Sequence, residues 1–395
     1  MLWAMSVRPR SLVTFAIVTV SLAGALAPAA RATTAGARPN ILLIVTDDQR
    51  WDTLWSMPNV QTDLMDHGKT FANMFVTNSL CCPSRASILT GDFSHTTGVY
   101  RNEPPWGAFP SFRDSSTLAT WLHGGGYRTA LFGKYIDAYQ SAGLSGYVPP
   151  GWDQWEAFIH AGFYDYQLSM NGAVSKYGSA PQDYSTNVLG NDAANYIRSA
   201  PTSQPLFVYW APEAPHAPAT PEAQYMDRYK DLPPWEVPSV NEPDTSDKPA
   251  YIRRITLYDH ARLVGEQTFR RNQYRTLVSV DQQVGNFVAA LADTGRLSNT
   301  MILFTSDNGL LWGEHRWSKK EVPYDESLRV PLVVRYDPLT SGRTRDTRLV
   351  LNADLAPTIA DLAGVAHPPT DGMSLLPILR GDAVSWREDF VLEHM

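Results

Sequence analysis

Cysteine is nearly absent from this sequence: there are two in 395 residues, and they are neighbours, Cys81 and Cys82. A disulfide between them would be strained, because consecutive Cα atoms lie about 3.8 Å apart whereas disulfides usually span roughly 4.4–6.8 Å. The simplest interpretation is a pair of small buried thiols with a packing role only. Their neighbours argue against it, because Pro83 suits a first helical turn, a helix N-terminus attracts anions, and Arg85 adds positive charge.

Positive charge is also in short supply, since 33 lysines and arginines face 40 acids, for a net charge of −7. Met1–Ala32 has the pattern of a signal peptide, with Arg8 and Arg10 at its start, an apolar stretch over Ser11–Leu26 and a small-x-small cleavage site at Ala30–Ala32. Its removal would take away three arginines and no acid, leaving 30 bases, 40 acids and a net charge of −10. Such a mature chain is not expected to be a general binder of nucleic acid or anionic lipid.

Cleavage after Ala32 predicts a secreted or extracytoplasmic protein. A stable membrane anchor is not expected, because the apolar stretch of the leader is short and no cysteine near the cleavage point could carry a lipid. We expect residues 33–39 to be a short linker and 40–382 to form one large domain. Residues 383–395 would begin a smaller C-terminal subdomain that the chain truncates, since 390–395 has the pattern of a further strand.

Tandem repeats are absent too, and strand patterns alternate with helix patterns along the chain. Apolar runs predict strands at residues 40–46, 128–132, 204–210, 300–305 and 329–335. Helices are predicted at 116–123, 269–291 and 354–363, and a proline-rich loop at 233–248. This alternation predicts an α/β fold with a large, mostly parallel sheet flanked by helices.

Polar residues follow two of these strands directly. Asp47 and Asp48 end the first run, and Asp307 and Asn308 follow the run at 300–305. Each pair alone could form a turn or a helix cap. Ligands of open α/β sheets bind at the carboxyl ends of the strands, however, and four oxygen donors without clustered thiolates or imidazoles favour Ca²⁺ or Mg²⁺ over zinc.

The stretch around the cysteines carries a family resemblance. The pattern Cys-x-Pro-Ser-Arg-Ala-x-x-x-Thr-Gly, from Cys81 to Gly91, resembles the signature of the formylglycine-dependent sulfatases of the alkaline phosphatase-like superfamily. The resemblance implies a sulfuric ester hydrolase with that fold and its small C-terminal subdomain. It also implies that a formylglycine-generating enzyme converts Cys81 to formylglycine (3-oxoalanine), with Cys82 at a variable position.

The same resemblance implies roles for residues elsewhere in the chain. A divalent ion, usually calcium and alternatively magnesium, would be held by Asp47, Asp48, Asp307, Asn308 and the formylglycine at position 81. The catalytic and sulfate-binding side chains would be those of Arg85, Lys134, His216 and Lys320.

Each of these last residues has a recognisable sequence context. Lys134 follows Gly133, and His216 lies in a Pro-His-x-Pro element and would face the leaving oxygen. Lys320 lies four residues before Tyr324, with its neighbour Lys319 as the alternative. His315 is near enough in sequence to touch the substrate.

One position departs from the family pattern. Many members have a histidine two residues after the lysine corresponding to Lys134, where it is associated with release of sulfate. Here Ile136 occupies that position, and Asp137 follows it. The identity of the base is therefore open.

The segments Tyr147–Trp155 and Phe163–Leu168, with Asn171 and Gly172, resemble the N-acetylglucosamine-6-sulfatase branch. The predicted function is removal of sulfate from a sulfated sugar of the N-acetylglucosamine-6-sulfate type, or from an aryl sulfate, by a formylglycine hydrate nucleophile. One alternative is a formylglycine-dependent phosphonate or phosphodiester hydrolase. Another is a non-catalytic, glycan-binding homologue with an unmodified Cys81.

Overall fold

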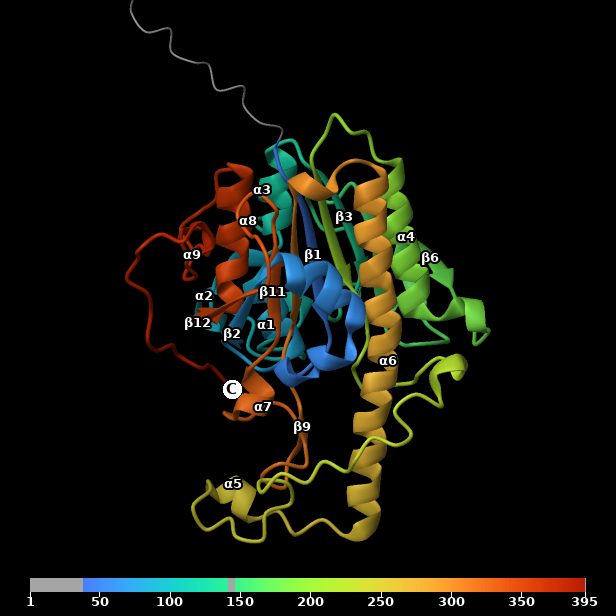
Figure 1. The fold of residues 1–395 in the computed structure, drawn as a ribbon, viewed down its shortest axis with the longest axis vertical. Coiled ribbons are helices and arrows are strands. Elements are labelled where there is room, and N and C mark those ends of the chain that lie inside the picture. The colour runs from blue at the N-terminus through green and yellow to red at the C-terminus, as the bar shows by residue number, and fades with distance from the viewer. Residues whose placement is uncertain (1–37, 141–145, 395) are drawn as a thin grey trace, which may run out of the picture. The chain divides into compact units, whose positions relative to one another are not determined.

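A ten-stranded sheet forms the centre of this computed structural model, which describes residues 38–140 and 146–394 (Figure 1). The predicted signal peptide and most of the predicted linker lie outside the described residues. In spatial order the strands are β12 (Thr344–Leu351), β2 (Lys69–Phe75), β11 (Leu332–Arg335), β8 (Thr300–Ser306), β1 (Asn40–Thr46), β7 (Leu206–Ala211), β3 (Arg128–Gly133), β4 (Gln154–His160), β5 (Gln167–Met170) and β6 (Ala173–Lys176). A separate ribbon pairs β9 (Leu311–Trp312) with β10 (Ser318–Lys319).

The strands from β8 to β4 run parallel to one another, whereas β11, β5 and β6 are antiparallel to their neighbours. Strand β1 lies between β8 and β7, and all seven of its residues are buried. Its side chains alternate between two cores: Ile41, Leu43 and Val45 belong to one, Leu42 and Ile44 to the other. An apolar run buried on both faces therefore produces a central strand, as the sequence predicts.

Helices cover both faces of the sheet, which confirms the predicted fold class (Figure 1). One core contains residues of α1 (Cys81–Thr90), α3 (Leu118–Gly124), α8 (Leu355–Ala363) and α9 (Leu376–Arg380). The other contains residues of α4 (Ser185–Ser199) and α6 (His260–Asp293). The short helices are α2 (Ser94–Thr97), α5 (Ala250–Arg253) and α7 (Asp325–Leu328). A short π-helix is η2 (Val60–Leu64). The short 3-10 helices are η1 (Trp51–Ser56), η3 (Met65–His67), η4 (Phe109–Ser111), η5 (Pro181–Asp183), η6 (Ala223–Tyr225), η7 (Leu297–Asn299) and η8 (Asn352–Asp354).

The structure differs from the sequence-based prediction at three elements. Helix α6 starts at His260 rather than at residue 269, because the Asp259 carboxylate caps it by accepting a hydrogen bond from the Arg262 N–H at 2.8 Å. Its N-terminal part extends past the sheet, beside the segment that carries α5 (Figure 1). Strand β11 is shorter than predicted and antiparallel to β8. Residues 390–394 form no strand and are held there by a hydrogen bond from the Glu393 N–H to the Thr77 carbonyl at 2.9 Å.

Two other expectations can be compared with the described residues. Cys81 and Cys82 are free, buried thiols rather than a disulfide. Within residues 38–140 and 146–394, no helix has the combination of length and apolar character needed to cross a bilayer.

Candidate active site

Asp47 and Asp48 follow β1 at the carboxyl edge of the parallel strands. The Asp47 N–H donates to the Ala214 carbonyl at 3.2 Å, beyond the end of β7. The Asp48 N–H donates to the Asp307 carboxylate at 3.1 Å, beyond the end of β8. Asp48 also has a positive φ of 65°, a conformation that aspartate tolerates better than most residues. These backbone bonds bring three strand ends to one buried point.

Helix α1 points its N-terminus at this point, and Cys81 is its first residue. The Cys81 Sγ lies 3.6 Å from an oxygen of Asp47 and 2.9 Å from the Nζ of Lys320. Arg85 lies one turn later on the same helix and is fully buried. Its guanidinium donates to Asp307 at 2.9 Å and lies 3.4 Å from Asp47. The spacing of the cysteine and the arginine thus places both on one face, toward the aspartates.

Two buried lysines complete the cluster. Lys134 donates to Asp47 at 2.5 Å, and Lys320 donates to Asp48 at 2.5 Å. The chain can reach the Lys134 position because Gly133 has a φ of 118°, and a Cβ there would lie 1.9 Å from the Ala211 carbonyl oxygen. Glycine is therefore required directly before Lys134, because any side chain at position 133 would collide with the backbone of β7.

His216 lies at the open side of the cluster, with 29% of its side chain exposed. Its Nε2 is 3.7 Å from Asp48, and its Nδ1 is 3.3 Å from Glu213. Nδ1 is also 2.7 Å from the carbonyl of Ala217. The imidazole is therefore fixed by its own loop and faces the aspartates.

The electrostatic balance at the centre is set by closely packed opposite charges. Burial acts to raise the pKa of Asp47, but the surrounding cations, led by Lys134, outweigh it and hold that pKa below its ordinary range. Burial acts to lower the pKa of His216, but Asp47 and Asp48 outweigh it and raise that pKa to about 9. At neutral pH the imidazole is then protonated and can donate a proton.

The Cys81 thiol is in a different condition. Burial, followed by the negative charge of Asp47, raises its pKa well above the ordinary value in spite of the nearby lysines. A protonated thiol is a weak nucleophile and a weak metal ligand. Position 81 thus lies among the charged groups of the site, but its unmodified thiol is poorly suited to act as a nucleophile or a metal ligand.

The arrangement of donors fits a divalent cation. Side-chain donor atoms of Asp47, Asp48, Cys81 and His216 all lie within 4.8 Å of one another. Asn308 is beside them, with its amide nitrogen 2.5 Å from Asp48 and its amide oxygen 3.5 Å from the Nζ of Lys320. Asp307 is bound by Arg85 and by the backbone of Asp48. Hard carboxylate oxygens in this number are the ligand type that Ca²⁺ and Mg²⁺ prefer.

Not every residue singled out in the sequence joins this cluster. His315 stacks on Tyr324 with ring centroids 4.1 Å apart, and its Nδ1 is 2.8 Å from Glu242. Lys319 is exposed in β10, so the cation in the cluster is Lys320.

Two neighbouring positions are occupied by core residues. Ile136 is buried in the core, and Cys82 packs in that same core while the Asp137 N–H donates to its sulfur at 3.3 Å. The two cysteines therefore have different surroundings.

A buried pair that the sequence did not reveal supports the site. Arg50 donates to Glu314 at 2.7 Å, and the guanidinium lies 4.0 Å from the ring centroid of Trp312. Glu314 also accepts hydrogen bonds from the Trp235 indole at 2.7 Å and from the Trp312 backbone at 2.5 Å. The pair joins the loop after β1, which carries the two aspartates, to the segment that leads to Lys320. No sequence signal distinguishes these two residues from surface charges.

Comparison with known proteins identifies the family. The sulfatase family model matches residues 39–365. Human N-acetylglucosamine-6-sulfatase is 35% identical over 373 residues, covering 90% of this chain and 67% of that protein. The extracellular sulfatase SULF-1 homolog of Drosophila melanogaster is 34% identical over 377 residues, covering 90% of this chain and 33% of that protein. The chain therefore spans between a third and two thirds of the length of these relatives.

Solved structures share the fold. A complex of a protein with its substrate D-glucosamine-2-N,6-O-disulfate has a TM-score of 0.74 at 24% identity, covering 89% of this chain and 82% of that chain. The phosphonate monoester hydrolase of Agrobacterium radiobacter has a TM-score of 0.71 at 22% identity, covering 89% and 79%. At these identities the likeness establishes the fold alone. The family is established by the sequence match, and this chain belongs to the sulfatase family.

Proposed function

We propose that this protein is a sulfuric ester hydrolase that removes sulfate from a sulfated sugar of the N-acetylglucosamine-6-sulfate type. The observation that carries the proposal is the position of Cys81, at the head of a helix, 2.9 Å from the Nζ of Lys320 and 3.6 Å from Asp47. Lys134 and Arg85 add two more buried cations beside the same aspartate. Such a site suits an anionic ester and a nucleophile at position 81.

A divalent metal ion, calcium or alternatively magnesium, is part of this proposal. Asp47, Asp48, Asp307 and Asn308 would hold it, together with the modified residue at position 81. When bound, such an ion polarises the ester oxygens and offsets their negative charge. With the ion bound, the negative charge of Asp47 would be balanced by the ion together with Arg85 and Lys134, and these two side chains would also hold the carboxylate in place.

We also propose that Cys81 is converted to formylglycine by a formylglycine-generating enzyme, and that the aldehyde hydrate supplies the attacking hydroxyl. His216 would donate a proton to the leaving sugar oxygen, since its imidazole faces the aspartates from the open side of the cluster. Lys320 would bind the sulfate. Ile136 has no titratable group, so it cannot be the base that assists release of sulfate. No other residue is assigned to that role.

The protein would be exported, and its leader would be cleaved after Ala32. In the mature chain, residues 33–39 would form a short linker and residues 40–382 the catalytic domain. Relatives named as extracellular sulfatases support export.

The experiment compares three substrates on the protein purified from a host that makes formylglycine. We expect hydrolysis of N-acetylglucosamine-6-sulfate and of an aryl sulfate, and loss of both after chelation with EDTA. Preference for an aryl phosphodiester would instead support the phosphonate or phosphodiester hydrolase. Glycan binding without turnover of any ester would support the non-catalytic homologue.

A further inference from the structure

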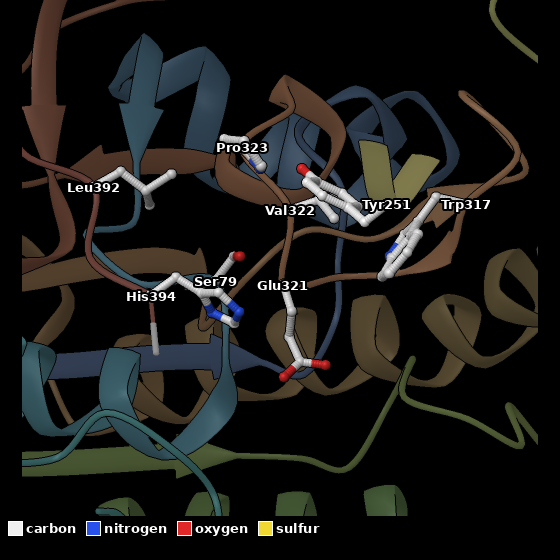
Figure 2. Close-up of a pocket in the computed structure, with 8 residues that line it drawn as sticks. All are labelled: Ser79, Tyr251, Trp317, Glu321, Val322, Pro323, Leu392 and His394. Atoms are coloured by element: carbon white, nitrogen blue, oxygen red, sulfur yellow. The ribbon is translucent and has the colours of Figure 1, made fainter. Parts of the chain in front are cut away.

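A cavity of about 560 Å³ is lined in part by residues that are close in sequence to Cys81 and Lys320, and Figure 2 shows its lining side chains. Its lining residues come from four separate stretches of the chain: Ser79, Tyr251, Trp317, Glu321, Val322, Pro323, Leu392 and His394. Ser79 precedes Cys81 by two residues, and Glu321 directly follows Lys320. Because consecutive Cα atoms are about 3.8 Å apart, the cavity wall begins within about 8 Å of the backbone at both reacting positions. A group attached to a sulfate at Cys81 could therefore extend into this cavity.

One wall of the cavity is aromatic. The rings of Tyr251 and Trp317 meet edge to face, with centroids 6.0 Å apart and planes at 79°. The Trp317 indole donates to the backbone carbonyl of Lys320 at 2.9 Å, which ties this wall to the segment that presents the lysine. Aromatic faces with nearby polar groups suit the mixed apolar and hydroxylated surface of a sugar ring. The volume is also in the range of small-molecule sites.

The charge of this cavity is opposite to that of the reaction site. Among the described residues that line it, Glu321 is the one acid, His394 is the one histidine, and there is no lysine or arginine. Glu321 is exposed, its carboxylate has no ion pair or hydrogen bond within the described part of the chain, and Figure 2 shows it extending away from Val322 and Pro323. The residue also has a φ of +70°, a costly conformation for a side chain of this kind. Residues held in this way often belong to functional sites.

We propose that this cavity binds the sugar ring of the substrate and that Glu321 selects against a second anionic group on it. The inference rests on the proposed sulfatase function. The ligand class is a sulfated hexosamine whose nitrogen is acetylated or free, as opposed to N-sulfated. The cations at Cys81 bind one sulfate, and the Glu321 carboxylate repels another in the adjoining cavity, which has no lysine or arginine in its wall.

The test compares N-acetylglucosamine-6-sulfate with D-glucosamine-2-N,6-O-disulfate, measuring release of the 6-sulfate from each. For the full chain carrying Glu321, we expect kcat/KM to be about fivefold higher for the N-acetyl substrate, the effect of one exposed charge. Glu321→Gln should remove most of that preference, chiefly by improving turnover of the disulfate. Glu321→Lys should reduce it further. The matched control is Glu388→Gln, an exposed carboxylate outside the cavity, which should leave the preference unchanged.

An equal change in both substrates on Glu321→Gln, or no change in either, would overturn the proposal. So would an unaltered chain that hydrolyses the disulfate as well as the N-acetyl sugar. A parallel assay with an aryl sulfate distinguishes a wrong assignment of the cavity from a wrong proposed function. If the aryl sulfate is hydrolysed but neither amino sugar is, the assignment of the cavity is wrong while the sulfatase activity stands. If no sulfate ester is hydrolysed, the proposed function itself fails.

Discussion

Two acids that are not part of the reaction site, Glu156 and Asp192, should give the protein a measurable dependence of stability on pH. Glu156 lies in β4 with 6% of its surface exposed, and it accepts a hydrogen bond from Gln154 at 2.8 Å. Burial, followed by the negative charge of Asp192 on α4, raises the pKa of Glu156 from its ordinary 4.5 to about 7. Burial also raises the pKa of Asp192. The folded protein therefore holds a proton on this pair that the unfolded chain releases.

The size and sign of the effect follow from this shift. A rise from 4.5 to about 7 corresponds to about 3 kcal/mol of folding free energy. Because the pKa is higher in the folded state, this contribution is fully present below pH 4.5 and is lost as the pH rises through about 7. Glu156→Gln removes the titration and keeps a neutral side chain of the same shape. The variant should thus gain up to about 3 kcal/mol relative to the unaltered protein between pH 5 and pH 8.

Urea denaturation at half-unit steps from pH 5 to pH 8.5 measures this difference, since titrations elsewhere in the chain are common to both proteins and cancel. Glu388→Gln, an exposed acid, serves as the control and should give a flat difference. A flat difference for Glu156→Gln as well would show that the pKa of Glu156 is not raised by folding. A Glu156→Gln variant that loses stability relative to the unaltered protein as the pH rises would show the opposite sign of the shift.

Three further predictions concern the reaction site. Cys81→Ala should abolish sulfate release, whereas Cys82→Ala should largely spare it at a stability cost of about 1 kcal/mol, and equal losses would show that the wrong cysteine was chosen. Calcium at 100 times its Kd should stabilise the protein by about 2.7 kcal/mol in thermal unfolding, and Asp48→Asn should remove most of that gain. Glu314→Gln should lower kcat at least tenfold and stability by about 2 kcal/mol, because the buried Arg50 then keeps Asp52 as its carboxylate partner but loses the charge of Glu314; an unchanged kcat would show that the pair does not position the site.

The sequence predicted the centre of the fold well. Strand β1 has the predicted bounds, and the predicted strands at 128–132 and 300–305 each gain one residue. These strands are buried on both faces, so their continuous apolar runs are unmistakable. Strand β2, with a mixture of buried and half-buried residues, had no such run and was missed. Strands β5 and β6 are short and lie at the sheet edge, where patterning is weak.

The site was predictable where a motif fixes local geometry. Cys81 and Arg85 lie four residues apart on a helix, and the aspartate pairs follow strands, so short-range rules bring each group together. The link between Arg50 and Glu314 spans 264 residues and depends on the packing of two loops, which periodicity cannot reveal. His315 was selected by sequence proximity alone; the structure places its Nδ1 2.8 Å from Glu242, and its contact with substrate stays a prediction.

Conversion of Cys81 to an aldehyde nucleophile can be seen directly in the mass of one peptide. Trypsin should release residues 70–85 as one peptide, since Lys69 and Arg85 flank a stretch without other basic residues. Mass spectrometry of this peptide from the native host should show the lighter aldehyde form, with fragment ions that place the change at Cys81 and leave Cys82 a thiol. An aminooxy probe should label the same residue. A peptide with two intact cysteines and no labelling, from protein that nevertheless hydrolyses sulfate esters, would contradict the account.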